Sequence, residues 1–370
     1  MAGIYVHIPF CRSFCIYCDF YSELFSRKGS ESFFSSFSEE CISRSSWAAS
    51  SGGIDTLYFG GGTPSLLTLE MLGRMMACLA DNFDLFRLVE TTIEVNPDDV
   101  CSNPRSWLDG LKGLGFDRIS MGVQSFDDRI LKWMNRRHDS KEAVRAYSLL
   151  RDAGFDNVSV DLIFGFAGLD DDIWMDTLAK TVSLPGGAPE HVSAYCMSLE
   201  PGSTLTGLYR EGKYAGMDDD AAAGQYSMLQ KALAEAGYVQ YEVSNFAKPE
   251  MYSRHNSSYW KGVPYLGLGP SAHSLSITPD GRRMRSWNSP DLASYVAGNS
   301  LGGYELLTPE EEEEERIMLG LRCISGAKLE EGRAAPLVRD GLLVGLPDGF
   351  YRIPDDKFFI SEYIIEKLLR

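Results

Sequence analysis

The chain has 370 residues, 44% of them hydrophobic and 12% aromatic, so it can bury a large core and is expected to form two or three domains. Its 52 acidic and 35 basic residues give a formal charge of -17, which argues against duplex nucleic acid or an anionic membrane surface as a partner. No apolar run approaches the ~20 residues of a membrane span. The start of the chain also lacks the basic and apolar regions of a secretory signal. The sequence therefore predicts a cytoplasmic protein without an integral membrane segment.

A cysteine-rich loop follows the first predicted strand, residues 4–8. Cys11, Cys15 and Cys18 lie within the segment YVHIPFCRSFCIYCDFYS, residues 5–22. The other five cysteines are scattered singly, as buried small hydrophobes usually are in a reducing compartment. Three clustered cysteines indicate a metal centre instead.

The spacing of these three cysteines favours an iron-sulfur cluster over zinc. It lacks the paired two-residue spacings of structural zinc sites, although His7 on the preceding strand could complete a closed zinc site. Iron-sulfur cubanes are held by cysteine thiolates, normally one per iron, so three cysteines leave one iron without a protein ligand. An open metal position indicates chemistry rather than a structural role.

Six short apolar runs rich in β-branched residues alternate with helical patterns up to about residue 200, which predicts an α/β fold with a parallel sheet. The runs cover residues 4–8, 54–59, 91–95, 118–123, 157–163 and 191–197. After the first run comes the cysteine loop, and the next five are followed by GGGTPS, NPDD, QSFDD, GFAG and SLEPGS. Since ligands of α/β folds bind at the carboxyl ends of the strands, all six loops should face one site.

Beyond residue 200 two smaller parts are expected. A helix over residues 218–236, a strand over residues 238–247 and the segment HNSSYW, residues 255–260, belong to the first. In the second, Pro309 and six following glutamates predict a helix start, and a hairpin turning on PDG precedes a last helix over residues 361–369. This pattern is typical of a small winged-helix-like module. Its 15 acidic and 9 basic residues over 301–370 favour packing against the barrel or contact with another protein rather than with DNA.

Six ordered motifs resemble those of the radical S-adenosylmethionine (SAM) superfamily, in the branch of the oxygen-independent coproporphyrinogen III oxidases. They are YVHIPFCRSFCIYCDFYS, YFGGGTPS, SMGVQSFDD, VSVDLIFG, YEVSNFA and RHNSSYW. The resemblance covers nearly the whole chain and is closest to the HemW-type haem chaperones. It implies a partial (β/α)6 radical SAM barrel over residues 1–200, an α/β extension over 201–300 and the winged-helix-like module over 301–370.

The resemblance also implies a [4Fe-4S] cluster on the three clustered cysteines, with SAM bound to its open iron. In the superfamily an electron from the reduced cluster cleaves SAM to methionine and a 5'-deoxyadenosyl radical, so an electron donor such as flavodoxin or ferredoxin is implied. Each implied SAM contact has an ordinary alternative role, as a turn glycine, a strand-end carboxylate or a solvated charge. The residues are Tyr5, Tyr17, Gly61, Gly62, Thr63, Glu94, Gln124, Arg136 and Asp161.

The segment HNSSYW resembles a motif, HNxxYW, that is associated with haem binding. The resemblance implies His255, Tyr259 and Trp260 as haem contacts, because a neutral imidazole can be an axial ligand and aromatic rings can border the macrocycle. His273 and Cys196 are alternative ligands. His255 could instead close a hydrogen-bonded turn packed against the barrel.

One position separates this chain from the coproporphyrinogen dehydrogenases, whose loop resembles CxxxCxxCxC. Phe20 stands where that pattern has its last cysteine, and the first strand begins at residue 4 without the long preceding extension of those enzymes. Both departures match the HemW-like branch and count against porphyrinogen decarboxylation, so it is left open whether the chain is an enzyme.

Three functions therefore remain open. The first is a haem chaperone that binds a cluster, SAM and haem and transfers haem to acceptor proteins. The second is a radical SAM enzyme that abstracts hydrogen from a porphyrinogen or another substrate. The third is a nucleic-acid-interacting iron-sulfur protein, which the acidic charge argues against. The sequence identifies neither the acceptor nor the oligomeric state.

Overall fold

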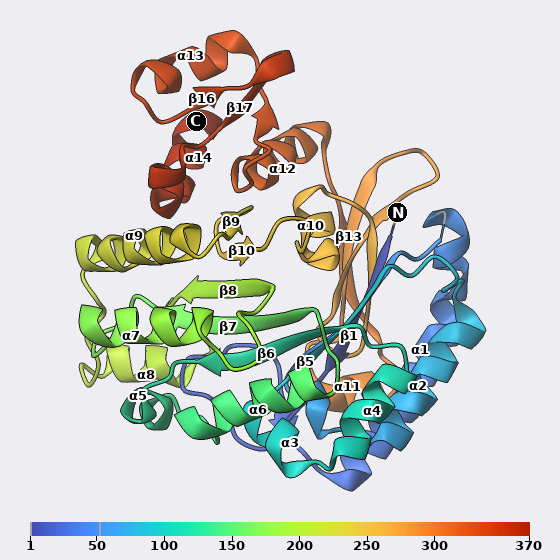
Figure 1. Cartoon of the computed structure of the whole chain (residues 1–370). Coiled ribbons are helices and arrows are strands. Elements are labelled where there is room, and N and C mark those ends of the chain that lie inside the picture. The colour runs from blue at the N-terminus through green and yellow to red at the C-terminus, as the bar shows by residue number, and fades with distance from the viewer. Residues whose placement is uncertain (1, 52) are drawn as a thin grey trace.

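One large twisted sheet forms the centre of the molecule in the computed structural model, which describes residues 2–51 and 53–370 (Figure 1). Twelve strands of the described chain pair in the order β14-β13-β12-β11-β1-β4-β5-β6-β7-β8-β10-β9. The six central strands are parallel and lie in chain order, which confirms the predicted α/β fold. They are β1 (Gly3–Ile8), β4 (Thr56–Gly61), β5 (Glu90–Val95), β6 (Arg118–Gln124), β7 (Val158–Phe164) and β8 (His191–Cys196).

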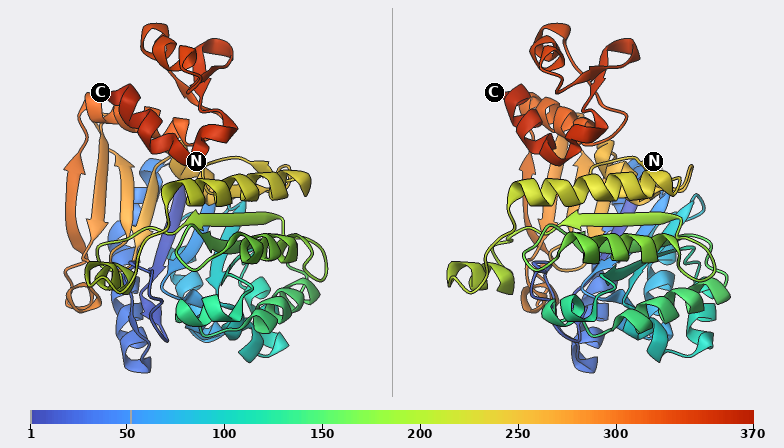
Figure 2. Two further views of the ribbon diagram at one scale, coloured as in Figure 1. Left: turned by 90° about the vertical axis from the view of Figure 1, so that its left-hand side faces the viewer. Right: turned by 60° about the vertical axis from the view of Figure 1, so that its left-hand side comes forward.

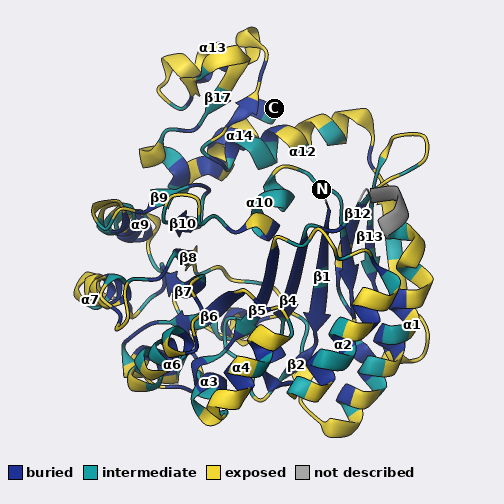
Figure 3. Cartoon of the chain, turned by 45° about the vertical axis from the view of Figure 1, so that its right-hand side comes forward, coloured by how far each residue is buried: buried dark blue, intermediate teal, exposed yellow. Residues whose placement is uncertain are grey.

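Helices between these strands cover one face of the sheet (Figures 1 and 3). They are α1 (Arg27–Ser51), α2 (Leu69–Asn82), α3 (Pro97–Ser102), α4 (Arg105–Gly113), α5 (Asp128–Trp133), α6 (Ser140–Asp152) and α7 (Asp171–Val182). Successive side chains of a strand point to opposite faces, so each strand gives one row of apolar side chains to this core. Ile4, Phe59, Ile93 and Ile119 belong to that row and are fully buried. The other row faces inward and carries the polar residues of the site.

The chain beyond β8 extends both edges of the parallel sheet. At one edge α8 (Thr204–Arg210) and α9 (Asp219–Glu235) lead to β9 (Val239–Gln240) and β10 (Asn245–Ala247), and β10 is antiparallel to β8. After α10 (Arg254–Trp260) the chain reaches the other edge, where β11 (Tyr265–Leu268) is parallel to β1. An antiparallel ribbon of β12 (His273–Ile277), β13 (Arg283–Asn288) and β14 (Leu301–Leu306) follows, with α11 (Leu292–Val296) between its last two strands.

The single strand predicted over residues 238–247 is wrong. β9 and β10 pair with each other as a short antiparallel hairpin, and residues 241–244 form the turn between them. The chain turns there because its polar groups are bonded across the turn and to the C-terminal part. The Val243 N–H donates to the Arg322 carbonyl, and the Ser244 N–H donates to the Glu242 carboxylate.

The last part of the chain forms a small module beyond α9, β9 and α10 (Figures 1 and 2). It contains α12 (Pro309–Leu321), β15 (Ala327–Lys328), α13 (Glu331–Arg339), β16 (Val344–Gly345), β17 (Phe350–Arg352) and α14 (Ser361–Leu369). The predicted helix start is confirmed: Thr308 caps α12 in a capping box with Glu311, and Pro309 is its first residue. The predicted hairpin is confirmed by the pairing of β16 with β17.

The boundaries of the three domains remain predictions, as does the winged-helix likeness of the last one. β14 lies beyond the predicted boundary at residue 300 and yet pairs with β13 in the large sheet. Across residues 2–51 and 53–370, no helix has the length and apolar character needed to cross a membrane.

Candidate functional site

A cavity of about 840 Å³ opens at the carboxyl ends of the central strands. This volume is in the range of small-molecule and cofactor sites. Its lining includes the cysteine loop, the glycine loop after β4, and residues that follow β5, β6 and β8. The loop after β7 was also expected to face the site, but residues 165–168 are absent from the lining, and β7 contributes Asp161 and Ile163 instead. The parallel topology therefore brings five of the six predicted loops together.

The cysteine loop is held at both ends by backbone pairing. β2 (Phe10–Cys11) and β3 (Glu23–Leu24) form a two-stranded parallel ladder that brackets the loop. Within it the Sγ of Cys11 lies 3.5 Å from the Thr63 hydroxyl, and the Sγ of Cys15 accepts a 3.5 Å hydrogen bond from Arg136 Nη1. Cys11, Cys15 and Cys18 all line the cavity and are half-buried free thiols.

The chemistry of this donor set suits a cluster better than a single metal ion. In the described chain no three His, Cys, Asp or Glu side chains are grouped as ligands of one ion would be. The alternative zinc ligand His7 is bonded elsewhere, since its Nε2 lies 2.8 Å from the Tyr21 carbonyl and its Nδ1 lies 3.1 Å from the Tyr5 hydroxyl. Thiols on one loop that face the same cavity without meeting at a point can each reach a different iron of a cubane.

The glycine loop after β4 lies directly against the cysteine loop. Gly61 has a φ of 105°, which favours glycine. A Cβ on Gly62 would lie 2.7 Å from the Phe10 carbonyl oxygen, so only glycine allows this approach of the two backbones. The backbones of the glycine loop and the cysteine loop are therefore in direct contact, which fixes the shape of this part of the cavity.

Glu94, at the inner face of β5, is held between this loop and β4. Its carboxylate accepts a 2.8 Å hydrogen bond from the Tyr58 hydroxyl and a 3.2 Å hydrogen bond from the Gly61 N–H. Burial raises the pKa of Glu94 to about 7, so the group changes charge near neutral pH. Such a carboxyl in a cavity is suited to bind a cationic group of a ligand.

Arg136 connects the cysteine loop to the strands beneath it. Besides Cys15, it donates to the Gly122 carbonyl and to the Asn96 amide oxygen, the latter at 2.6 Å. Burial alone would lower the pKa of Arg136, but the neighbouring Tyr17 and Cys15 raise it, and the guanidinium stays charged. Arg136 is a predicted SAM contact, and it also donates a hydrogen bond to the thiol of Cys15, a predicted cluster ligand.

Gln124 reaches the cavity through an unusual backbone. A bulge between Gly122 and Gln124 interrupts the pairing of β6 with β7, and Gln124 has a φ of 67°, in the left-handed region. A non-glycine residue in this region costs about 1–3 kcal/mol, and such strain is concentrated at functional sites. The bulge places the Gln124 side chain in the cavity lining.

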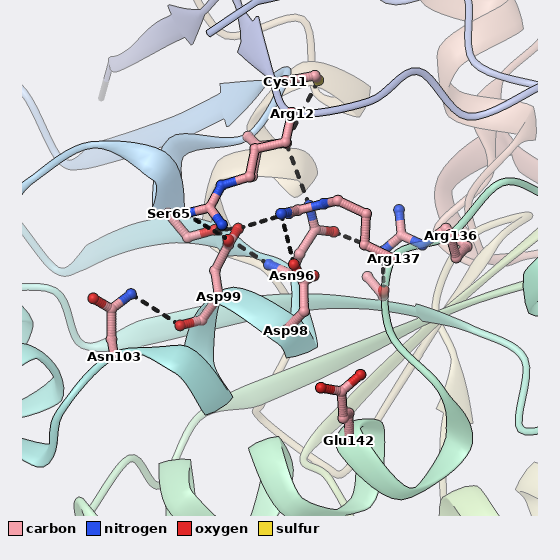
Figure 4. Close-up of polar contacts among 12 residues, drawn as sticks. Cys11, Arg12, Ser65, Asn96, Asp98, Asp99, Asn103, Arg136, Arg137 and Glu142 are labelled. Carbon is pink, nitrogen blue, oxygen red and sulfur yellow. Dashed lines mark hydrogen bonds and ion pairs between the residues drawn. The ribbon is translucent and has the colours of Figure 1, made fainter. Parts of the chain in front are cut away.

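An ion-pair network lies beside the cysteine loop and joins three of the rim loops (Figure 4). Arg137 lies 2.6 Å from the Asp98 carboxylate and 3.1 Å from that of Asp99. The Asp99 carboxylate is buried, accepts a 2.8 Å hydrogen bond from Ser65 and lies 3.9 Å from the exposed Arg12. The network therefore fixes the loops after β1, β4 and β5 relative to the segment that carries Arg136.

The remaining predicted SAM contacts are not all in the lining. Asp161 and Tyr17 line the cavity together with Gly61, Gly62 and Thr63. Tyr5 is not among the lining residues, because its ring is stacked behind that of Tyr58 at 6.0 Å and its hydroxyl contacts His7. Tyr5 is thus placed to support the cavity wall.

The haem-associated segment is a helix, α10, and not a loop. His255 is 1% exposed, and both of its ring nitrogens are bonded, Nδ1 to the Thr56 hydroxyl at 2.8 Å and Nε2 to the Tyr259 hydroxyl at 2.7 Å. The N–H groups of Arg254 and His255 donate to the Glu90 carboxylate. Because Thr56 and Glu90 begin β4 and β5, α10 closes the amino end of the half-barrel, opposite the cysteine loop.

Of the haem-associated segment, only Asn256 is part of the cavity lining. Trp260 lies near the guanidinium of Arg322 from the C-terminal module, at 5.9 Å. Among the alternative ligands, Cys196 lines the cavity, and burial raises the pKa of its thiol to about 11. His273 begins β12, which lies between β11 and β13 in the sheet, and is outside that lining.

Several lining residues were missed by sequence reasoning. Tyr58, Arg118, Ser120 and Ser193 alternate with core residues on their strands and point inward, so the two-residue period of each strand could have identified them. Asn96 was within a motif already singled out, NPDD, but its contacts to Arg136 and Thr63 depend on the fold.

Comparisons with known proteins identify the family of the chain. A family model for the radical SAM superfamily matches residues 5–180. The chain is 33% identical over 357 residues to the heme chaperone HemW of Mycobacterium tuberculosis, covering 92% of this chain and 88% of that protein. It is 32% identical over 337 residues to the heme chaperone HemW of Bacillus subtilis, covering 88% of this chain and 84% of that protein.

Among solved structures, the chain is similar in fold to the coproporphyrinogen III oxidase HemN of Escherichia coli, described as a radical SAM enzyme. The TM-score is 0.82 at 22% sequence identity, over 99% of this chain and 89% of that one. At this identity the likeness supports the fold and not the activity.

Proposed function

The chain belongs to the HemW family of heme chaperones within the radical SAM superfamily, and from this membership we propose that it binds a [4Fe-4S] cluster, SAM and haem and transfers haem to acceptor proteins. One structural observation carries the proposal. A single cavity brings three free thiols of one loop together with a tight glycine turn and a buried carboxyl, Glu94.

The residues have separate tasks in this proposal. Cys11, Cys15 and Cys18 hold the cluster, and Arg136 donates to Cys15 so that negative charge on that sulfur is stabilised. Gly61, Gly62 and Thr63 line the cavity beside the cysteine loop and would contact the methionyl end of SAM. Glu94 and Asp161 accept from its donor groups. When bound, a reduced cluster would supply an electron to SAM, drawn from a donor such as flavodoxin or ferredoxin.

Haem would extend from the outer part of the same cavity toward its floor. Phe14 and Phe20 belong to its lining and are 47% and 67% exposed, so they offer apolar contact to a macrocycle. Under this proposal the two candidate haem ligands are Cys196, which lines the same cavity, and His255, which is bonded to Thr56 at the start of β4.

The test is a transfer experiment under anaerobic conditions. The protein is reconstituted with iron and sulfide, loaded with haem, separated from free haem and mixed with the haem-free form of a b-type haem protein. We expect the acceptor spectrum to develop faster with loaded chaperone than with an equal amount of haem on serum albumin. Failure to bind haem, or transfer no faster than from albumin, would contradict the proposal.

The second candidate is a coproporphyrinogen-oxidising radical SAM enzyme, which the motifs of the chain also resemble. Phe20 argues against it, because the corresponding loop of those enzymes has a further cysteine there. We expect no conversion of coproporphyrinogen III to protoporphyrinogen IX by the reduced, SAM-supplied protein. Substrate-dependent formation of that product over several turnovers would favour the enzyme instead.

A further inference from the structure

Arg118, the first residue of β6, carries a buried charge without a close partner. The residue is 1% exposed and belongs to the cavity lining. Its Nε and Nη1 atoms are buried and have no hydrogen-bond partner in the described chain. Removing a charge from water is costly unless the charge is paired and hydrogen-bonded, so the position of Arg118 calls for an acceptor.

The nearest carboxylates do not supply this acceptor. Glu94 and Asp161 interact with Arg118 electrostatically, and its charge lowers the pKa of each below what burial alone would give. Their oxygens, however, accept from other donors: Glu94 from Tyr58 and Gly61, and Asp161 from serine hydroxyls of β6 and β7. These carboxylates balance the charge of Arg118 at a distance, while its Nε and Nη1 donors remain unpaired in the described residues.

A second unpaired donor lies in the same layer of the sheet. Arg118 is directly opposite Thr92 on β5, and Thr92 is opposite Tyr58 on β4. The hydroxyl of Thr92 is buried and likewise has no partner in the described residues. Asn256, from the helix that closes the half-barrel, adds a polar side chain to the cavity lining.

This layer lies well below the cysteine loop. Arg136, which contacts Cys15, also bonds the carbonyl of Gly122. Gly122 is four residues further along β6 than Arg118, and at about 3.3 Å per residue the two positions are ~13 Å apart. Arg118 therefore belongs to the floor of the cavity and not to its rim.

We propose that Arg118 binds a carboxylate of the ligand that fills the cavity. The planar guanidinium presents paired donors that match the two oxygens of a carboxylate. This inference rests on the proposed function, which offers two carboxylate sources, a propionate of haem and the methionyl carboxylate of SAM. The depth of Arg118 favours the propionate, because SAM is expected to chelate the open iron at the level of the cysteines.

The experiment compares ligands that have and lack the carboxylate. Cluster-reconstituted parent protein and R118Q are titrated with haem, haem dimethyl ester, SAM and decarboxylated SAM, with R210Q as a control that removes an exposed arginine at the end of α8, outside the cavity lining. We expect R118Q to bind haem about ten- to a hundredfold more weakly than the parent. The dimethyl ester should bind parent and R118Q equally, and R118K should recover part of the haem affinity.

The other outcomes are also decisive. Loss of SAM affinity in R118Q, with decarboxylated SAM unaffected, would support the site and assign the carboxylate to SAM. Unchanged affinity for haem and SAM in a folded R118Q would overturn the inference, and a lower melting temperature with unchanged affinities would make Arg118 a residue of the fold. If R118Q does not fold, R118K is the test variant, and equal weakening for each ligand and its carboxylate-free analogue would overturn the site. A parent that binds no haem contradicts the proposed function alone, since the SAM pair still tests Arg118.

Discussion

His255 of α10 is hydrogen-bonded to Thr56 at the start of β4, with 2.8 Å between the imidazole Nδ1 and the hydroxyl oxygen. Its other nitrogen meets Tyr259, and its ring stacks on Tyr58 at 5.1 Å. An axial ligand needs a nitrogen with a free lone pair. In this arrangement His255 can approach a haem iron only after it gives up one of these two hydrogen bonds.

We therefore expect H255A to lower the stability of the fold, whether or not it also changes haem binding. The substitution leaves a cavity under the sheet and removes two buried hydrogen bonds, which should lower the free energy of unfolding by about 2–4 kcal/mol. Denaturant unfolding and a haem titration should be measured together, with H273A as the exposed control. A stable H255A protein with a changed haem spectrum would instead assign His255 to haem ligation.

Stability should also fall in mild acid through His255. Burial lowers the pKa of His255 to about 3, whereas in the unfolded chain it is about 6.5. Between these values the unfolded state binds one more proton, so stability is complete above pH 6.5 and is lost as the pH falls. Relative to the parent, H255Q should reduce the dependence of unfolding free energy on pH by up to ~1.4 kcal/mol per unit between pH 4 and 6. Equal slopes would show that His255 is protonated in the native protein.

Burial also lowers the pKa of His7, His138, His191 and His273, so the parent should show a steep acid limb in the same window. The difference between the parent and H255Q therefore measures the one proton that His255 binds. A loss of the whole acid limb in H255Q would mean that the variant had changed the surroundings of the other four histidines.

SAM binding should depend on the ionisation of Glu94. Its pKa of about 7 means that the carboxylate is mostly protonated at pH 6 and mostly ionised at pH 8. Because a carboxylate attracts the cationic ligand, SAM affinity should rise about tenfold over this interval. Calorimetry in E94Q should give a weaker and nearly pH-independent affinity. An unchanged pH profile in E94Q would remove Glu94 from the binding of SAM.

Within the ion-pair network, Arg137 should contribute more to stability than the exposed Arg12. R137Q leaves Asp98 and Asp99 close together and without their main partner, which should cost about 3–5 kcal/mol. R12Q removes an exposed partner at 3.9 Å and should cost less than ~1 kcal/mol. The free energy of unfolding of both variants should be measured in urea. Similar decreases would mean that the ion pairs of Arg137 contribute no more than a surface contact.

Each of Cys11, Cys15 and Cys18 should be required for the cluster. Substitution of any one by alanine should abolish the charge-transfer absorbance and most of the iron bound after anaerobic reconstitution. C101A is the matched control, since Cys101 is a half-buried thiol of α3 outside the cavity lining. A cluster of normal iron content in C11A, or its loss in C101A, would show that the ligand set is wrong.

The sequence predicted the elements that depend on local pattern. The parallel strands follow from apolar runs with helices between them, and the meeting of Cys11, Gly61 and Glu94 follows from strand ends that share one rim. The start of α12 follows from Thr308, Pro309 and the glutamates after them. Each of these features follows from a local sequence pattern together with the general rule that the ends of parallel strands share one edge of the sheet.

Features that depend on distant partners could not be predicted. α10 forms where Glu90, 165 positions before His255, accepts two of its N–H groups. The unpaired state of Arg118 becomes visible only when the oxygens of Glu94 and Asp161 are seen to be occupied by other donors. A sequence states which residues are charged, but the fold determines which donors are left over.

The path of the chain from β10 through α10 to β11 joins the two edges of the parallel sheet by one short covalent connection, residues 248–264. Such a strap limits how far the half-barrel can spread, because separating its edges would pull α10 away from Thr56 and Glu90. The width of the cavity is therefore limited at the amino end of the half-barrel, where α10 lies. We therefore expect a large ligand to enter this cavity from the side of the cysteine loop, opposite α10.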